Sequence, residues 1–201
     1  MKRKSLALIF VCCALALAAQ DVIKVNYRGA TPTIIDFTRA FANFIDNEDD
    51  CGDKPTGGVL LALNNYRKGL PQEEGVTIEV DKKNGYILYE FRLGNTIVRR
   101  EACFWNEADG KHKLFAFNNM ASISDGQPYI SETSGITFCR YNNATKKMRF
   151  CKNPDFEMDY INTTYALPRI GKDIIVTKWN EDGTKTEKTL KWNGHGFDPT
   201  D

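Results

Sequence analysis

The residues of this chain best suited to chemistry are its two histidines, His112 and His195, and its cysteines. Each histidine lies beside a predicted turn or tail, and neither belongs to a metalloprotease, serine-hydrolase, P-loop or dinucleotide-binding motif. A cysteine hydrolase would need a free thiol near one of these histidines. Because an even set of exported cysteines is better explained by disulfides, we expect no catalytic residue among them.

Carboxylates are the other candidates, since two converging Asp or Glu side chains can hydrolyse a glycosidic bond. Glu90 and Glu101 lie on predicted strands, where pairing with Arg99 and other basic residues is the simpler interpretation. The acidic run 46–53 does not match a calcium-binding loop, because Cys51 stands where that loop needs glycine. The sequence therefore predicts no metal site and no cofactor.

Arg100 is the first candidate for ligand binding, because the predicted register places it opposite Tyr89 on an apolar face. A guanidinium there needs a buried acidic partner, or else it faces a cavity and binds an anionic or carbonyl group of a ligand. We expect the structural role and keep the ligand role as the alternative. Aromatic side chains that could face a sugar or a protein, with core packing as the simpler role, are Trp105, Trp179, Trp192 and Tyr129.

The N-terminus has the pattern of a secretory signal peptide. Lys2, Arg3 and Lys4 precede an apolar run that ends in the small residues of Ala16-Leu17-Ala18. Residues 1–18 are therefore expected to be removed on export to the periplasm or the extracellular space, and no later stretch is apolar enough to span a membrane. With 27 Lys and Arg against 26 Asp and Glu, the chain has no charge excess that favours nucleic acid.

Four cysteines follow the signal segment: Cys51, Cys103, Cys139 and Cys151. In an exported chain they predict two disulfides, for which three connectivities exist. We expect the pairs Cys51–Cys103 and Cys139–Cys151. The apolar pattern weakly prefers a different register for the second pair, in which Cys139 faces Phe150.

Helical spacing of apolar residues predicts a helix from Thr31-Pro32 to about Asp46, and a second helix over 59–68. From residue 76 the period changes to two, and turns at Asn84-Gly85, Gly94-Asn95 and Asp109-Gly110 predict a four-stranded meander over 76–118. In that register Ile78 pairs with Phe91, Phe91 with Val98, Glu90 with Arg99, Phe104 with Phe115 and Ala102 with Phe117.

The other face of this meander carries an apolar outer patch, which we expect the first helix to cover. It consists of Ile97, Cys103, Trp105, Leu114 and Ala116. Further along, a hairpin is predicted over 136–152 and a strand near 160–167. A last hairpin, centred on Asp182-Gly183, pairs Lys178 with Glu187 and aligns Ile175, Trp179, Leu190 and Trp192.

Several segments of the C-terminal half resemble uncharacterised exported bacterial proteins with a β-rich body. The similarity lies in Trp105-Asn106…Asp109-Gly110, in Gly135-Ile136-Thr137-Phe138, in Leu167-Pro168-Arg169 and in the closing Leu190-Lys191-Trp192-Asn193-Gly194…Phe197. These are turn and core residues, so the resemblance implies a bacterial envelope location and carries no activity.

The sequence thus predicts a single α+β domain over 19–201, with a helical part at 31–69 packed on a β-rich part at 76–193. The β-rich part is expected to be mainly an antiparallel meander or a partly closed barrel. For function, we expect a non-catalytic binding or interaction module of the cell envelope, with a glycan or an envelope protein as partner. A hydrolase of polysaccharide or peptidoglycan, working through carboxylates, is the alternative.

Overall fold

The computed structural model describes residues 22–48, 56–120, 122–124, 127–129, 134–151, 162–180 and 182–199. The predicted signal peptide and Cys51 lie outside these ranges, as does the side chain of Tyr129. None of the described helices is long and apolar enough to cross a membrane.

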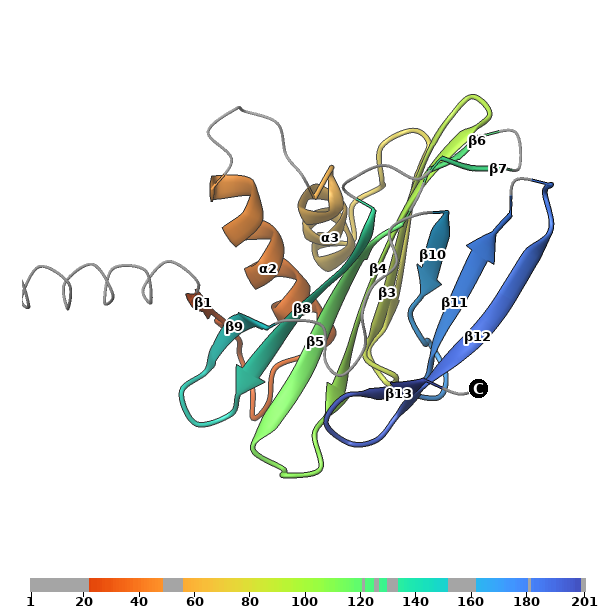
Figure 1. The fold of residues 1–201 in the computed structure, drawn as a ribbon. Helices are drawn as coiled ribbons and strands as arrows, with labels where there is room; N and C mark the ends of the chain where they lie inside the picture. The colour runs from red at the N-terminus through yellow and green to blue at the C-terminus, as the bar shows by residue number, and fades with distance from the viewer. Residues whose placement is uncertain are drawn as a thin grey trace, which may run out of the picture.

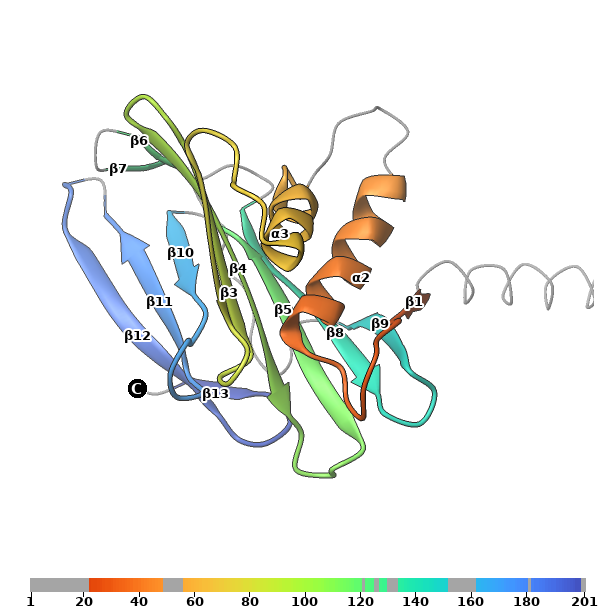
Figure 2. The same ribbon diagram turned by 180° about the vertical axis from the view of Figure 1, so that it is seen from behind.

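The described residues form three layers: two helices, a large central sheet and a smaller second sheet (Figures 1 and 2). The central sheet has the order β1-β9-β8-β5-β4-β3-β2, with β6 and β7 attached beside β4, and its pairings are antiparallel. Its strands are β1 (Val22–Lys24), β2 (Val76–Asp81), β3 (Tyr86–Leu93), β4 (Thr96–Asn106), β5 (His112–Asn119), β6 (Ser122–Ser124), β7 (Gln127–Tyr129), β8 (Gly135–Asn142) and β9 (Lys147–Cys151).

The predicted combination of helices and antiparallel strands is confirmed. The predicted partly closed barrel is not, because β1 and β2 end the strand order as open edges of the described sheet.

Helix α2 (Ile34–Glu48) begins three residues after Thr31, where Asp36 accepts hydrogen bonds from the backbone and hydroxyl of Thr33 at 2.8 and 2.7 Å. Its apolar stripe lies on the central sheet: the ring of Phe37 is 5.0 Å from that of Tyr141, and Phe41 is 5.0 Å from Phe117. Helix α3 (Val59–Lys68) has the predicted bounds. It ends at Gly69, whose φ of 66° suits glycine and closes the last turn.

Most of the predicted meander register is correct. Strands β3, β4 and β5 pair Phe91 with Val98 and Phe104 with Phe115, as expected. The β2–β3 register is wrong by two residues, because Ile78 lies opposite Tyr89. The connection is the four residues 82–85, in which Asp81 accepts the backbone N–H of Asn84 at 3.0 Å. A shift of two residues keeps each side chain on its predicted face.

The prediction that the first helix covers the outer patch is wrong. Helix α2 packs on the opposite face of the sheet, against Phe115 and Phe117, and the second sheet covers Cys103, Trp105, Leu114 and Ala116. The central sheet is apolar on both faces, so each face needs its own cover. The second sheet has the order β10 (Thr163–Ala166), β11 (Ile174–Trp179), β12 (Lys185–Trp192) and β13 (Phe197–Pro199).

The register of the β11–β12 hairpin differs from the prediction by one residue. Glu187 faces Thr177 instead of Lys178, because the connection contains five residues, 180–184, instead of two. An odd shift exchanges the two faces. Ile174 and Val176 therefore share the core with Leu190, and Ile175 and Trp179 alternate onto the other face.

The register of β8 and β9 bears on one of the two predicted cysteine pairs. No disulfide joins the described cysteines Cys103, Cys139 and Cys151 to one another, and Cys139 faces Phe150 while Cys151 faces Phe138. Cys139 belongs to the core under the helices and Cys151 packs against the core under the second sheet. A Cys139–Cys151 disulfide does not fit this register, because the two side chains lie on opposite faces of the sheet. The Cys51–Cys103 pair involves a residue outside the described ranges and stays a prediction.

Glu101 joins the two sheets through a buried carboxylate. Its oxygens accept hydrogen bonds from the Tyr86 hydroxyl at 2.7 Å, the Asn118 amide at 3.0 Å and the backbone N–H of Leu167 at 2.9 Å. Asn118 also donates to the carbonyl of Tyr165 at 2.7 Å, so two residues of the central sheet hold the β10 segment. Glu101 was expected to pair with a basic residue, which is wrong, whereas the expected Glu90–Arg99 pair is confirmed.

We therefore expect Glu101→Ala to lower the free energy of unfolding by about 3 kcal/mol, because it leaves three buried hydrogen-bond donors without an acceptor. Glu90→Ala, on the neighbouring strand, removes a half-exposed ion pair and should cost about 1 kcal/mol or less. Urea unfolding of both variants measures the difference. Equal losses would contradict the role of Glu101 as the link between the sheets.

Candidate functional site

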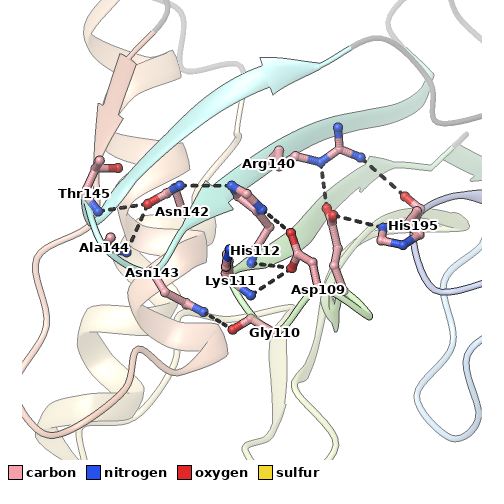
Figure 3. A network of polar contacts seen from close by, with 11 residues as sticks. Asp109, Gly110, Lys111, His112, Arg140, Asn142, Asn143, Ala144, Thr145 and His195 are labelled. Atoms are coloured by element: carbon pink, nitrogen blue, oxygen red, sulfur yellow. Dashed lines mark hydrogen bonds and ion pairs between the residues drawn. The ribbon is translucent and has the colours of Figure 1, made fainter.

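A network of polar side chains lies at one end of the central sheet (Figure 3). It brings together the β4–β5 turn, strand β8 and the turn between β12 and β13. The backbone of Ala108 donates to the carbonyl of Gly194 at 2.9 Å, so two turns far apart in the sequence are joined directly.

Asp109 organises the first turn. One carboxylate oxygen accepts the backbone N–H groups of Lys111 at 2.8 Å and His112 at 3.0 Å, and the other lies 2.5 Å from Nδ1 of His112. Gly110, at φ 66°, permits the tight turn. The bond from the His112 side chain, followed by the backbone bond from Lys111, lowers the pKa of Asp109 to about 2.

Asn142 fixes the tautomer of His112. Its carbonyl oxygen accepts the backbone N–H groups of Ala144 at 3.0 Å and Thr145 at 2.9 Å, so its NH₂ group faces Nε2 of His112 at 2.9 Å. An amide NH₂ group only donates, so Nε2 accepts and the imidazole proton resides on Nδ1, toward Asp109. Both ring nitrogens are therefore occupied.

Glu107 forms the buried half of the network. Its side chain is 4% exposed. Its carboxylate accepts a hydrogen bond from Nε of Arg140 at 2.6 Å and lies 3.6 Å from Nδ1 of His195. Arg140 also donates to the carbonyl of His195 at 3.3 Å. A buried carboxylate with a hydrogen-bonded cation is a stable arrangement that fixes the turns around it.

These residues are poorly arranged for catalysis. The thiol of Cys151 lines the same groove as His112, but burial raises the pKa of Cys151 and His112 has no free nitrogen to act as its base. Glu107, Asp109 and His112 place ligand atoms within 4.8 Å of one another. A cation there would compete with Arg140 for Glu107 and with the imidazole proton for Asp109.

A groove of about 480 Å³ opens beside the network, and we call it the β8–β9 groove. Lys147 and Arg149 project from β9 and are exposed, and Arg140 adds a third cation whose charge Glu107 balances. Its described lining consists of His112, Arg140, Asn142, Thr145, Lys147, Arg149, Phe150 and Cys151. None of these residues is acidic.

The structure places Arg100 opposite Tyr89, as predicted, on the face that the helices cover. Its guanidinium lies 5.9 Å from the centre of the Tyr89 ring. It also lies close to Gly57, where an added Cβ atom would be only 2.7 Å from Nη2 of Arg100. Its buried Nε has no hydrogen-bond partner among the described residues. Burial lowers the pKa of Arg100, and the nearby charges of Tyr89 and Asp46 act in the opposite direction. Among the described residues no carboxylate forms an ion pair with it, so the expected buried partner is not found there.

Two of the tryptophans proposed as binding residues, Trp105 and Trp192, pack in the core between the sheets, and Trp179 does not. Trp105 is 4% exposed, donates to the carbonyl of Lys172 at 2.8 Å and stacks on Trp192 at 5.6 Å. Trp179 is separate from them, on the outer face of the second sheet, and donates to the hydroxyl of Thr164 at 3.0 Å.

Sequence reasoning singled out His112, His195 and the Asp109-Gly110 turn but missed Glu107, Arg140 and Asn142. Glu107 lies in the β4–β5 turn, and Arg140 and Asn142 lie on β8, so their separation in the sequence gave no signal. No protein-family model, no curated protein and no solved structure matches this chain.

His112→Ala should raise the pKa of Asp109 from about 2 toward the ordinary 3.8. A depressed pKa adds stability that is full above the ordinary value and is lost as the pH falls through about 2. Side-chain carboxyl shifts in NMR follow the titration. Asp182 is the internal control, because its pKa is lowered by Thr184 without a histidine and should not change. An unchanged Asp109 midpoint would contradict the network.

Arg100→Met should leave the free energy of unfolding unchanged or raise it by up to about 2 kcal/mol, because it removes a poorly compensated buried charge and keeps the apolar stem. Arg99→Met, one residue away, loses a half-exposed ion pair and should change stability by about 1 kcal/mol or less. A loss of about 3 kcal/mol or more for Arg100→Met would instead show that an acidic partner compensates its charge.

Proposed function

We propose that the protein is a non-catalytic binding module of the bacterial cell envelope that holds an anionic glycan in the β8–β9 groove. The observation that carries the proposal is the one-sided charge of that groove. Its described lining adds the exposed cations Lys147 and Arg149 to Arg140, whose charge Glu107 balances, and contains no acidic residue, although the whole chain is nearly neutral. A concentration of one charge in a concave site favours a ligand of the opposite charge.

The polar network beneath the groove supports binding better than turnover. Hydrogen bonds fix His112, Asn142 and Arg140, so the groove wall is rigid before a ligand arrives. Rigid donors lower the entropic cost of binding, and a guanidinium fork suits carboxylate or sulfate oxygens. The volume of about 480 Å³ is in the range of small-ligand sites.

The alternative function, a hydrolase working through carboxylates, has little support among the described residues. Such an enzyme needs a carboxylic acid whose pKa is raised, so that it can protonate the leaving group. The pKa of Asp109 is lowered instead, and Glu107 is bound to Arg140. Glu101, the other acid considered, is buried between the two sheets, where it accepts a hydrogen bond from the backbone N–H of Leu167.

The envelope location is part of the proposal and is supported by the sequence pattern of residues 1–18. Acidic polysaccharides are the class of anionic partner that we propose for the exported protein. The second sheet, whose Trp179 face is partly exposed, remains available as a surface for an envelope protein.

Calorimetric titration with trigalacturonate, and with maltotriose as its neutral counterpart, tests the proposal. We expect the acidic trisaccharide to bind without being cleaved and maltotriose not to bind. Lys147→Gln/Arg149→Gln should weaken the binding of trigalacturonate about tenfold.

Lys188→Gln/Lys191→Gln is the matched control, since it removes the same charge from exposed positions of β12. An equal loss in the control would reduce the effect to net charge and would contradict a specific groove. Absence of binding by the unchanged protein would overturn the proposal, and cleavage of the trisaccharide would favour the hydrolase.

A further inference from the structure

A second and larger groove lies on the helix side of the central sheet. Its volume is about 990 Å³, and it is formed where the chain passes from β1 into α2, beside the end of α3 and the β2–β3 turn. We call it the helix-side groove. The cations in its lining are Arg28, Arg39, Arg67 and Lys82.

No described residue neutralises the cations of the helix-side groove. None of the four forms an ion pair within the described part of the chain. Asp36 is the single acid among the described lining residues, and its carboxylate is occupied by the backbone and hydroxyl of Thr33 at the start of α2. The groove therefore has a clear excess of positive charge.

Arg39 gives an independent indication of a missing acceptor. Its Nε is buried, yet it has no hydrogen-bond partner in the part of the chain that the structure describes. A buried donor is nearly always satisfied, so the described part of the protein leaves the guanidinium of Arg39, a half-buried side chain of the groove wall, without an acceptor of its own. Arg39 lies on α2 and Arg67 on α3, so the donors come from rigid elements.

Two tyrosines of the lining hold lysines at the edge of this groove. The ammonium of Lys82 lies 5.9 Å from the ring of Tyr66, and that of Lys146 lies 5.2 Å from the ring of Tyr27. Such contacts orient a flexible ammonium without neutralising it. The tyrosines thus add positioned charge to the groove.

The helix-side groove and the β8–β9 groove flank the same hairpin turn. In the β1–β9 pairing Lys24 faces Lys147, and the backbone of Val25 donates to the carbonyl of Lys146 at 3.1 Å. The chain then continues directly through Asn26, Tyr27 and Arg28 into the lining of the helix-side groove. Lys147 lines the β8–β9 groove, and Lys146 contacts Tyr27 of the helix-side groove. Positive charge therefore continues from one groove to the other across the β8–β9 turn.

From this arrangement we infer that the helix-side groove is a second anion-binding site, and that the two grooves together bind one linear acidic polysaccharide across the β8–β9 turn. This inference rests on the proposed function of the β8–β9 groove and extends it from a short ligand to a polymer. A repeating anion suits two basic grooves in series, because linked sites bind a chain more tightly than a fragment. A sequence pI near 7.5 is low for a nucleic-acid-binding domain, which favours the polysaccharide.

The test compares trigalacturonate with a long galacturonate oligomer, measured by calorimetry on the unchanged protein and on two double variants. We expect the long chain to bind about tenfold or more tightly than the trisaccharide. Arg39→Gln/Arg67→Gln should remove most of that advantage and leave part of the trisaccharide binding, because the β8–β9 groove is intact. Lys147→Gln/Arg149→Gln should weaken both ligands.

Lys188→Gln/Lys191→Gln again serves as the control for charge, and the melting temperature of each variant shows that it is folded. If the long chain binds no better than the trisaccharide, or if Arg39→Gln/Arg67→Gln changes neither affinity, the inference is overturned while the proposed function stands. If neither ligand binds the unchanged protein, the proposed function fails as well. Equal or tighter binding of single-stranded oligothymidylate would overturn the choice of a polysaccharide.

Discussion

The architecture depends on one constraint: the middle of strand β4 is covered on both faces, so the carboxylate of Glu101, buried there, must find its hydrogen-bond donors inside the protein. Ala102 and Phe104 face the helices, and Cys103 and Trp105 face the second sheet. Glu101 shares the second face and meets the constraint by accepting donors from β3, β5 and Leu167. The second sheet is thereby held over the middle of the central sheet, and the β8–β9 end carries the basic groove.

Local features of the sequence predicted local structure well. The bounds of α3 follow from Gly69, and the β3–β4–β5 register follows from alternating apolar residues around two tight turns. The two register errors have a common cause, because the side chains of Asp81 and Asp182 bond to nearby backbone groups and stabilise longer connections. A two-residue turn was assumed in both hairpins, and a side-chain bond of this kind is hard to anticipate.

Long-range features were much less predictable. The position of Arg100 opposite Tyr89 was correct because it follows from register, but the element that covers each sheet face depends on tertiary packing between two comparable apolar surfaces. Trp105 and Trp192 were considered as binding residues, and they stack in the core between the sheets. The contacts of Glu107 with Arg140 and His195 join three segments that are distant in the sequence, so no residue spacing predicted them.

Amide hydrogen exchange at Leu167 tests this account most directly. Its N–H donates to the buried carboxylate of Glu101 at 2.9 Å, although Leu167 lies just beyond the end of β10. If that bond holds the two sheets together, the amide of Leu167 should exchange only through global unfolding, as slowly as the amides at the centre of β4 and β5. Exchange at the rate of an open loop, with the central strands still protected, would contradict the account.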